Sequence, residues 1–425
     1  MLTLPYIREN KERILAGLET RNYPQDIKAS LDQIIDLDDR RKANQAERDD
    51  SLSQVNRLSK EIGTLYQSGQ REKADEMKAQ VADIKEQAKS LEAQQQDIQG
   101  QLDDLLLSIP NVPHPSVPSG SSEDDNEVVR PWKEDVTSLK GGLPHWELAT
   151  KYGLIDFETG TKITGAGFPL FRGQGARLER ALINFFLDSA SSAGYEEVIP
   201  PLVVNADSAK ATGQLPDKEG QMYYVERDDL YLIPTAEVPV TNIYRNVIIS
   251  ESDFPIKLTG YTPCFRREAG SYGADVKGLN RVHQFDKVEI VQITHPDKSY
   301  ETLDEMFSYV GGLLDQLELP YRILRLCGGD LGFTSALTYD FEVYSAGQGR
   351  WLEVSSVSNF ETFQANRLRL RYKDADGKKH LAHTLNGSAL ALARIVAAIL
   401  ENNQVEDGIM VPKVLQGYMK SEKIT

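Results

Sequence analysis

The sequence predicts an α+β protein in which an antiparallel α-helical coiled-coil arm precedes a domain of antiparallel strands flanked by helices. Two observations carry this prediction. A stretch of about eighty residues near the N-terminus has no proline and repeats its apolar residues at helical spacing. The remainder of the chain alternates between short runs typical of β-strands and segments typical of amphipathic helices.

Length and composition indicate two domains. At 425 residues the chain is too long for one compact core. We place the boundary near residue 110, which separates an N-terminal helical domain, 1–110, from a second domain, 111–425. The first residues lack the apolar core of a signal peptide, and no run approaches the ~18–20 apolar residues of a membrane span. Two cysteines, Cys264 and Cys327, cannot build a disulfide framework. Together these three observations lead us to expect a cytoplasmic protein without a membrane partner.

The net charge of −16 argues against binding nucleic acid over the whole surface. Between residues 40 and 89, however, eleven Lys and Arg face nine Asp and Glu. Because screening confines electrostatic effects to ~8–10 Å, this less acidic part of the arm permits a local RNA contact without indicating one.

The predicted arm consists of two helices joined by a turn at Ser68-Gly69-Gln70. The second helix carries a regular coiled-coil seam, whereas the first has apolar ends and a polar middle. The seam of the second helix consists of Ala74, Met77, Val81, Ile84, Ala88, Leu91, Gln95, Ile98, Leu102 and Leu105, and that of the first of Ile27, Leu31, Ile34, Leu52, Val55, Leu58, Ile62 and Leu65. Oligomerisation or spacing is the common use of such a segment, while a hairpin that satisfies its own seam suits a projecting arm roughly 55 Å long.

Prolines, acidic residues and then a helix follow the arm. Five prolines and an acidic run between residues 109 and 131 indicate a linker or a strap over the surface. Apolar residues on one face predict an amphipathic helix over 176–188. A short strand ending in prolines is predicted over 194–204.

Prolines also bracket Thr235 and Glu237 in the segment 231–239. This pattern suits a hydroxyl and a carboxylate held on an irregular strand, and an ordinary edge strand explains it equally well.

The central feature is a predicted antiparallel hairpin over 259–293, with a polar connection containing Gly270, Gly273 and Gly278. Alternation predicts that Arg266 and Glu268 share one face of the first strand. It also places Arg281, Phe285 and Glu289 on one face of the second. Such a mixture of charges around an aromatic ring is poor packing but suits ligand binding. We interpret His283 in the same hairpin as structural.

The C-terminal part is expected to form a helix over 300–318, a strand over 351–359 with Glu353 and Ser355 on one face, and a helix over 386–401. The last helix is apolar on every side except at Arg394, and polar residues 386–388 are expected to cap it. A buried guanidinium needs an anion, which is either a structural carboxylate or a ligand phosphate. Because the GxxxxGK[ST] and dinucleotide fingerprints are absent, arginines would have to hold the phosphates of any nucleotide.

These segments resemble the three signature motifs of class II aminoacyl-tRNA synthetases, and most closely those of bacterial-type seryl-tRNA synthetases. Motif 1 is similar to GYEEVIPPLVV with Pro201, motif 2 to CFRREAG through RVHQFDKVE, and motif 3 to LNGSALALAR ending on Arg394. TGQLP, PTAEVP and LEVSS are also seryl-type sequences. The resemblance covers the whole chain, including the arm.

The resemblance implies a class II catalytic domain over 111–425 and a homodimer across motif 1. It implies that L-serine and ATP form seryl-adenylate and pyrophosphate, and that serine is then transferred to the 3′ end of tRNA(Ser). The arm in 1–110 would bind the long variable arm of that tRNA. Charging of tRNA(Sec) is implied as well.

The resemblance also implies site residues. Arg266 and Arg394 would be catalytic, and Glu353 and Ser356 would hold Mg²⁺ with ATP. The ATP site would comprise Arg266, Arg267, Glu268, Phe285, Glu353, Val354, Ser355, Ser356 and Arg394, and the serine pocket Thr235, Ala236, Glu237, Glu289 and Ser388.

Two other functions remain open at the level of sequence. A synthetase-like paralogue would adenylate an amino acid and load a carrier protein, although such proteins generally lack the arm. A non-catalytic coiled-coil scaffold would have no need for the charged residues that the motifs retain.

Overall fold

The computed structural model describes residues 1–23, 27–132, 141–217, 219–268 and 276–425. The predicted glycines Gly270 and Gly273 of the hairpin connection lie outside the described residues. The chain divides into two compact units. One contains Met1, Gly17–Asn22 and Asn111–Thr425, and the other contains Leu2–Ala16 and Tyr23–Pro110.

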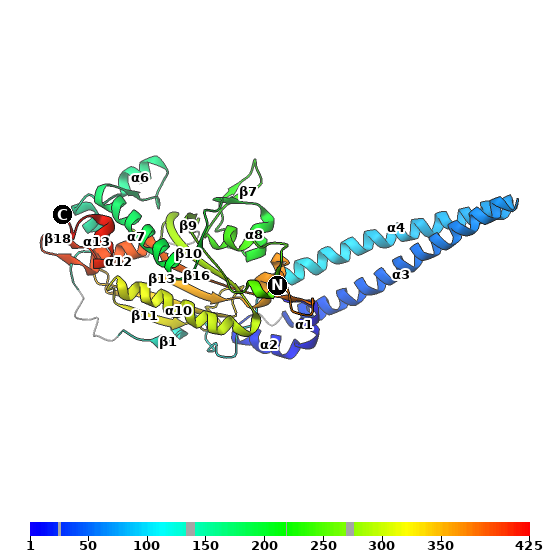
Figure 1. Cartoon of the computed structure of the whole chain (residues 1–425), viewed down its shortest axis with the longest axis horizontal. Helices are drawn as coiled ribbons and strands as arrows, with labels where there is room; N and C mark the ends of the chain where they lie inside the picture. The colour runs from blue at the N-terminus through cyan, green and yellow to red at the C-terminus, as the bar shows by residue number, and fades with distance from the viewer. Residues whose placement is uncertain (24–26, 133–140, 218, 269–275) are drawn as a thin grey trace. The chain divides into compact units, whose positions relative to one another are not determined.

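Helices account for most of the smaller unit and flank the sheets of the larger one (Figure 1). The α-helices are α1 (Leu4–Glu9), α2 (Lys11–Thr20), α3 (Ile27–Gln67), α4 (Arg71–Ser108), α5 (His145–Lys151), α6 (Phe157–Ile163), α7 (Gly173–Ser192), α8 (Ala206–Thr212), α9 (Glu237–Asn242), α10 (Ser299–Gln316), α11 (Thr362–Leu368), α12 (Leu392–Asn402) and α13 (Lys413–Met419). Across the described residues, no helix combines the length and apolarity that crossing a bilayer requires.

The strands form one large sheet and several small ones. They are β1 (Glu127–Arg130), β2 (Ile155–Asp156), β3 (Leu170–Phe171), β4 (Glu196–Glu197), β5 (Val203–Val204), β6 (Tyr224–Val225), β7 (Leu230–Leu232), β8 (Ile248–Ser250), β9 (Ile256–Phe265), β10 (Gln284–Thr294), β11 (Tyr321–Arg325), β12 (Leu337–Ser345), β13 (Arg350–Asn359), β14 (Arg371–Lys373), β15 (Lys379–Leu381), β16 (His383–Ala391), β17 (Gln404–Val405), β18 (Gly408–Met410) and β19 (Lys423–Ile424).

The helical hairpin predicted from the seam is confirmed, with α3 and α4 packed along each other and Ser68–Gln70 as the turn. Six of the predicted α4 seam residues are buried: Ala74, Val81, Ala88, Leu91, Ile98 and Leu102. Leu52 was wrongly placed in the seam, because it is 44% exposed and Ser51 is buried in its stead. The Ser51 hydroxyl donates to the carbonyl of Glu47 one turn earlier, which satisfies a polar group in the seam.

The polar middle of α3 is also paired. Asn44 donates to Gln94 of α4 through its side-chain amide at 3.2 Å. Burial alone would raise the pKa of Asp38, but hydrogen bonds from Lys42, Arg41 and Arg8 lower it to about 2. The arm therefore replaces apolar contacts with hydrogen bonds where the apolar pattern weakens.

The segment after the arm is a strap rather than a loose linker. The side-chain amide of Asn111 donates to the carbonyls of Thr334 and Phe360, each at 2.9 Å. Val117 is buried in the main core. The strap ends in β1, which pairs with β11 as an edge strand.

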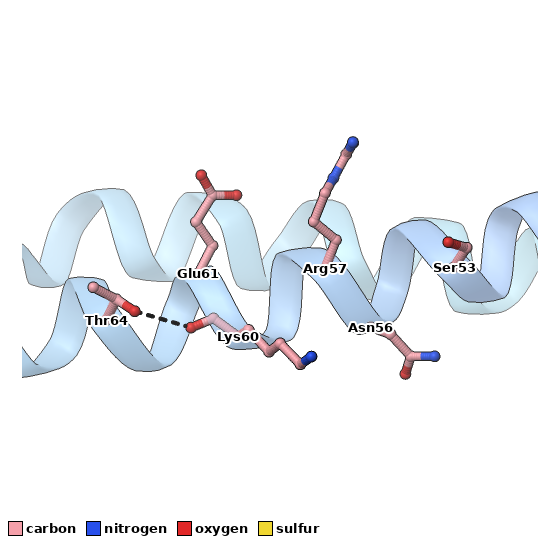
Figure 2. A pocket seen from close by; sticks show the side chains of 6 residues that line it. All are labelled: Ser53, Asn56, Arg57, Lys60, Glu61 and Thr64. Atoms are coloured by element: carbon pink, nitrogen blue, oxygen red, sulfur yellow. Dashed lines mark hydrogen bonds between the residues drawn. The ribbon is translucent and has the colours of Figure 1, made fainter.

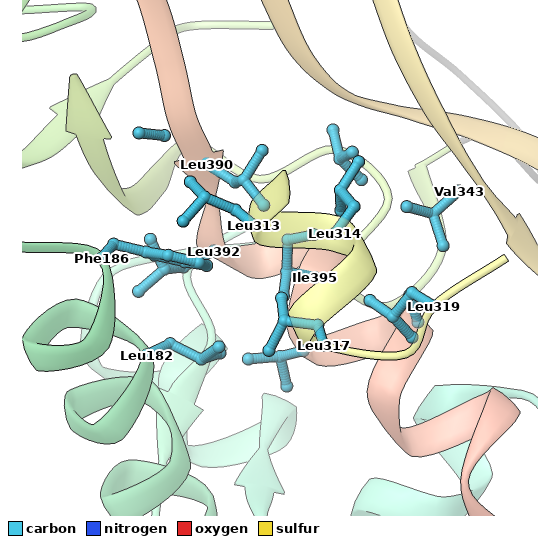
Figure 3. Packing of buried hydrophobic residues seen from close by; sticks show 14 of the residues in the cluster. Leu182, Phe186, Leu313, Leu314, Leu317, Leu319, Val343, Leu390, Leu392 and Ile395 are labelled. Carbon is cyan, nitrogen blue, oxygen red and sulfur yellow. The ribbon is translucent and has the colours of Figure 1, made fainter. Parts of the chain in front are cut away.

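The large sheet has the order β1-β11-β12-β13-β16-β10-β9-β4. All neighbours are antiparallel except β4 and β9, which are parallel. The predicted α+β class, with an antiparallel sheet flanked by helices, is confirmed. Helices α7, α10 and α12 pack on the sheet through one apolar core, and Figure 3 shows Phe186, Leu313 and Ile395 meeting there.

Two predicted elements were wrong in part. Residues 386–391 belong to β16, a central strand, and the last helix begins only at Leu392. A short apolar run suits a strand buried on both faces as well as it suits a buried helix, so residues 386–388 do not cap a helix. The segment 231–239 leaves the strand after Leu232, and Glu237 begins α9.

Candidate active site

Three adjacent strands, β13, β16 and β10, carry seven of the fourteen site residues named from the sequence, and Arg266, Arg267 and Glu268 follow directly after the next strand, β9. On β10 the side chains alternate between faces. Val288 and Ile290 belong to the main core under α7, α10 and α12. Phe285, Lys287 and Glu289 therefore face the opposite side of the sheet, which is the side of the candidate site.

Arg266 follows directly after β9 and lies against Phe285. The guanidinium carbon is 5.3 Å from the centre of the Phe285 ring, within the range of a cation–π contact. Its Nε donates to the carbonyl of Pro234 at 3.3 Å. This bond ties the end of the β9 strand to the loop that carries Thr235.

The alternation predicted that Glu268 shares a strand face with Arg266, and this prediction is wrong. The strand ends at Phe265, and Glu268 has a φ of 48°, a left-handed conformation that breaks the alternation. Arg281 likewise precedes β10, and its guanidinium lies 3.2 Å from the Glu268 carboxylate. Arg267 is exposed, with its backbone N–H bonded to the Gln221 carbonyl at 2.9 Å.

A buried carboxylate lies further along β10. Glu289 is 2% exposed, and one carboxylate oxygen lies 2.6 Å from Nζ of Lys287. The hydroxyl of Thr235 donates to the same oxygen at 3.3 Å. Burial raises the pKa of Glu289, and the contact with Lys287 opposes that rise.

A second carboxylate, that of Glu237, lies at the start of α9 beside buried Ala236. Its Oε1 accepts a hydrogen bond of 2.7 Å from the side-chain amide of Gln364. Burial and the neighbouring Glu289 raise the pKa of Glu237 to about 7. The site can therefore change its charge near neutral pH.

A bulge in β13 brings Glu353 and Ser356 together. The β12 pairing shifts register between Phe341 and Glu342, so Ser355 and Glu353 oppose consecutive residues of β12. Consequently Ser356 donates to Glu353 at 3.2 Å, although three positions separate them. The prediction that Glu353 and Ser355 share a face is wrong. Ser355 is buried, and its hydroxyl donates to the Ser388 carbonyl at 2.6 Å. Val354 belongs to the main core.

Arg394 lies in the first turn of α12 and has structural partners. Its Nη1 donates to the backbone carbonyl of Glu353 at 2.6 Å and lies 3.7 Å from the Glu353 carboxylate. Its Nε donates to the carbonyl of Asn280 at 3.0 Å. The side chain keeps 25% of its surface exposed, so it is available to a ligand and is not the fully buried cation that the sequence suggested.

These contacts form a continuous row. Arg394 meets Glu353 on β13, Ser355 meets Ser388 on β16, and Ser388 stands opposite Glu289 in the register of β10. From Glu289 the row continues through Thr235 and Pro234 to Arg266 and Phe285. Residues from six separate segments are thus linked from Arg394 to Phe285.

His283 lies beside the row but is engaged structurally. Its Nδ1 shares a hydrogen bond of 2.8 Å with the hydroxyl of Tyr223, and its ring stacks on Phe168 at 5.3 Å between centroids.

Sequence reasoning missed Lys287, Asn280 and Gln364. Lys287 had a usable signal, because it lies two residues from both Phe285 and Glu289 on one strand face. Asn280 and Gln364 had none, since each acts through a contact with a distant segment.

The arm carries a separate polar surface on α3, distinct from the row of site residues. Polar side chains of α3 line a hollow of about 800 Å³ there (Figure 2): Ser53, Asn56, Arg57, Lys60, Glu61 and Thr64.

Comparison with known proteins shows the family of this chain. Residues 1–113 match the seryl-tRNA synthetase N-terminal domain, and residues 223–403 match the class II tRNA synthetase core domain (G, H, P, S and T). A serine–tRNA ligase of Salinibacter ruber is 50% identical over 421 residues, covering 98% of each chain. A serine–tRNA ligase of Geobacter sulfurreducens is 47% identical over 422 residues, covering 99% of this chain and 98% of its own.

Solved structures agree with that comparison. Seryl-tRNA synthetase from Pyrococcus horikoshii, complexed with ATP, superposes with a TM-score of 0.90 at 36% identity and covers 100% of this chain and 99% of its own. The cytoplasmic serine–tRNA ligase of Naegleria fowleri, in complex with AMP, gives 0.85 at 28% identity, with the same coverage. Because both family models match and whole relatives match over nearly the full length, the chain belongs to the seryl-tRNA synthetase family of class II aminoacyl-tRNA synthetases.

Proposed function

We propose that this protein is a serine–tRNA ligase, which activates L-serine with ATP and transfers it to tRNA(Ser). The observation that carries the proposal is the 50% identity to a serine–tRNA ligase across 98% of both chains. The row from Arg394 to Phe285 supports the proposal, because its arginines and carboxylates are the groups that such a reaction requires.

In the proposed ATP site, Phe285 stacks on adenine and Glu268 accepts from its amino group. Arg266 binds the α-phosphate, and Arg394 lies near the γ-phosphate. The remaining proposed contacts are Arg267, Glu353, Val354, Ser355 and Ser356. Two features support this arrangement: the approach of Arg266 to the Phe285 ring and the partial exposure of Arg394. The buried Val354 and the bonded Ser355 are left to contact ATP through their backbone.

In the proposed serine pocket, Glu237 and Glu289 receive the ammonium and hydroxyl groups, and Thr235, Ala236 and Ser388 complete the wall. Two buried carboxylates side by side form a poor core but a suitable receptor for a small cation with a hydroxyl. A pocket that bonds the serine hydroxyl rejects alanine, because its polar groups would remain unpaired.

The first step needs positioning and charge neutralisation. An oxygen of the serine carboxylate attacks the α-phosphorus, the bond to the β-phosphate oxygen breaks, and pyrophosphate leaves. No proton moves, so arginines suffice and no histidine base is required. Arg266, held by Pro234, is placed to stabilise the charge that develops on the α-phosphate.

Mg²⁺ is proposed to accompany ATP. Glu353 and Ser356 offer adjacent oxygen ligands, which suits an ion that keeps most of its ligands from phosphates and water. No group of three or more His, Cys, Asp or Glu among the described residues could hold a metal alone. When bound, the ion would neutralise phosphate charge.

In the second step, the 3′-terminal ribose of the tRNA takes the seryl group and AMP leaves. We propose that residues 1–110 bind the tRNA through the arm and that residues 111–425 carry the chemistry. Charging of tRNA(Sec) is proposed with it, on the family resemblance alone.

We also propose a homodimer and a cytoplasmic location. Exposed apolar residues around motif 1 support the dimer: Ile199 is 89% exposed, Leu202 39% and Val203 38%. The two cysteines, both free and buried, are compatible with a reducing compartment. Light scattering during size-exclusion chromatography tests the dimer.

Serine-dependent ATP–pyrophosphate exchange, followed by charging of a tRNA with a long variable arm, tests the function. Exchange together with charging is expected. Exchange without charging would favour a paralogue that loads a carrier protein, and the absence of exchange would favour a non-catalytic scaffold.

A further inference from the structure

Gln364 of α11 is a buried glutamine that joins three segments. It is 1% exposed, and its Nε2 donates to Oε1 of Glu237 at 2.7 Å. The same nitrogen lies 3.4 Å from the carbonyl oxygen of Thr212, which accepts from it. The hydroxyl of Thr384, which is fully buried on β16, donates to Oε1 of Gln364 at 2.8 Å.

These partners determine the orientation of the amide. Two acceptors, the Glu237 carboxylate and the Thr212 carbonyl, lie on the NH₂ side, and a hydroxyl donor lies on the oxygen side. A flipped amide would point its oxygen at both acceptors and leave two buried oxygens without donors. Gln364 is therefore a fixed donor aimed at Glu237.

Glu237 depends on its amide donor because no described residue places a cation beside it, in contrast to its neighbour Glu289. Glu289 has Lys287 at 2.6 Å and the Thr235 hydroxyl. Among the residues that the structure describes, no Lys or Arg lies within 4.0 Å of the Glu237 carboxylate. An ionised carboxylate buried without a cation requires strong hydrogen bonds to remain charged.

We propose that Gln364, held by Thr384, is a positioning residue for serine activation, which keeps Glu237 oriented and ionised to receive serine. The inference rests on the proposed function, because it assigns Glu237 to the serine pocket. Gln364 acts through Glu237 and is not itself placed against the substrate.

The surroundings of Glu237 allow the effect to be measured through pH. Burial and Glu289 raise the pKa of Glu237 to about 7, and the bond from Gln364 is the largest opposing contribution, followed by Lys287 and Asn386. Charged groups acting on Glu237 thus come from β10, whereas α11 and β16 contribute amides. Losing the amide donor should move the pKa of Glu237 further above 7, so that it is protonated at neutral pH.

The test is serine-dependent ATP–pyrophosphate exchange with Gln364→Met, which keeps the size of the side chain and removes the donor. We expect the KM for serine to rise roughly ten- to hundredfold at neutral pH, as for loss of a hydrogen bond to a charged group. The KM for ATP should stay within about twofold. The ratio of serine KM between variant and wild type should be largest near pH 6 and shrink toward about pH 9, as Glu237 ionises in both proteins.

Thr384→Val provides a milder second test, with an expected rise in serine KM of about three- to tenfold and the same pH trend. Thr384→Ser keeps the hydroxyl donor and should retain the serine KM of the wild-type protein. Gln292→Met and Thr338→Val are matched controls, because both residues are buried and bonded to Tyr195 and Ser358 respectively, away from Glu237. They should leave serine KM unchanged.

An unchanged serine KM in Gln364→Met, or a KM ratio that does not vary with pH, overturns the inference. If Gln364→Met does not fold, the pH trend of Thr384→Val decides in its place. Absence of exchange in the wild-type protein would instead refute the proposed function.

Discussion

His145 and Glu401, which are 256 positions apart, share a buried hydrogen bond of 2.7 Å between Nδ1 and Oε1. The other ring nitrogen, Nε2, accepts from the backbone N–H of Leu279 at 2.8 Å. Because an accepting Nε2 carries no proton, the ring is neutral with its proton on Nδ1. Glu401 also accepts from the Ser345 hydroxyl and from the N–H of Gly347. The end of α12 is thereby joined to α5 and to the segment that carries Asn280, the partner of Arg394.

Glu401→Gln should lower the free energy of unfolding by roughly 1–3 kcal/mol, because it weakens several bonds to one buried carboxylate. Burial alone would raise the pKa of Glu401, but the bonds from His145 and Ser345 lower it below its ordinary value. A lowered pKa adds stability above the ordinary value near 4, and that stability is lost as the pH falls through the folded-state value. Denaturant unfolding should therefore show the variant and wild type converging in acid. Exposed Glu406→Gln is the control, and an equal effect there would contradict the assignment.

Arg266→Ala should lose serine-dependent exchange by roughly 10²- to 10³-fold, as when a donor to a developing charge is removed. Arg266→Lys should recover only part of it, because lysine lacks the planar fork that binds phosphate oxygens and carboxylates. Steady-state exchange kinetics measure both, with exposed Arg13→Ala on α2 as the control. Normal exchange in Arg266→Ala would refute its assigned role.

Replacing Ile27–Ser108, which spans α3 and α4, by a short linker should spare exchange and abolish tRNA charging. The reason is that the row of site residues lies entirely within the unit that contains Asn111–Thr425. Removing two cations of the α3 hollow, through Arg57→Ala and Lys60→Ala, should lower charging and flatten its salt dependence. Undiminished charging by the deletion variant would show that the arm does not bind the tRNA.

Glu237→Gln should abolish serine activation and yet stabilise the protein in the absence of serine. The pKa of Glu237 is raised to about 7, so its stabilising protonation is present below the ordinary glutamate pKa and is lost as the pH rises through 7. We expect the free energy of unfolding of the variant to exceed that of wild type by on the order of 1–3 kcal/mol at pH 8 and to equal it near pH 4. Thermal unfolding at the two pH values checks this, and a gain of equal size at both would exclude the charge as its cause.

The same carboxylate predicts how activity depends on pH. Without a proton Glu237 can receive the serine ammonium, and with one it cannot. The KM for serine of the wild-type protein should therefore rise as the pH falls below about 7, whereas the KM for ATP should change less. Exchange kinetics at several pH values measure both constants, and parallel changes in the two would point to a group other than Glu237.

The sequence by itself determined the helical hairpin, the pair β9 and β10, helices α7 and α10, the strand β13 and the family. Each of these follows from a period or a motif carried by neighbouring residues, and periods of 3.6 and 2 are local properties. The roles assigned to Arg266, Phe285, Glu289 and Arg394 remain predictions, although the structure places these residues along one row.

Only the tertiary structure decided the rest. Residues 386–391 became a strand because β10 and β13 lie on either side of β16 and pair with it through backbone hydrogen bonds, which no local pattern records. Glu353 and Ser356 meet through a bulge that is defined by β12. His145 is hydrogen-bonded to Glu401, and Gln364 to Glu237, although each pair is far apart in the sequence. A polar side chain buried by such contacts takes its function from partners that are distant in sequence, so its role becomes visible only once the chain has folded.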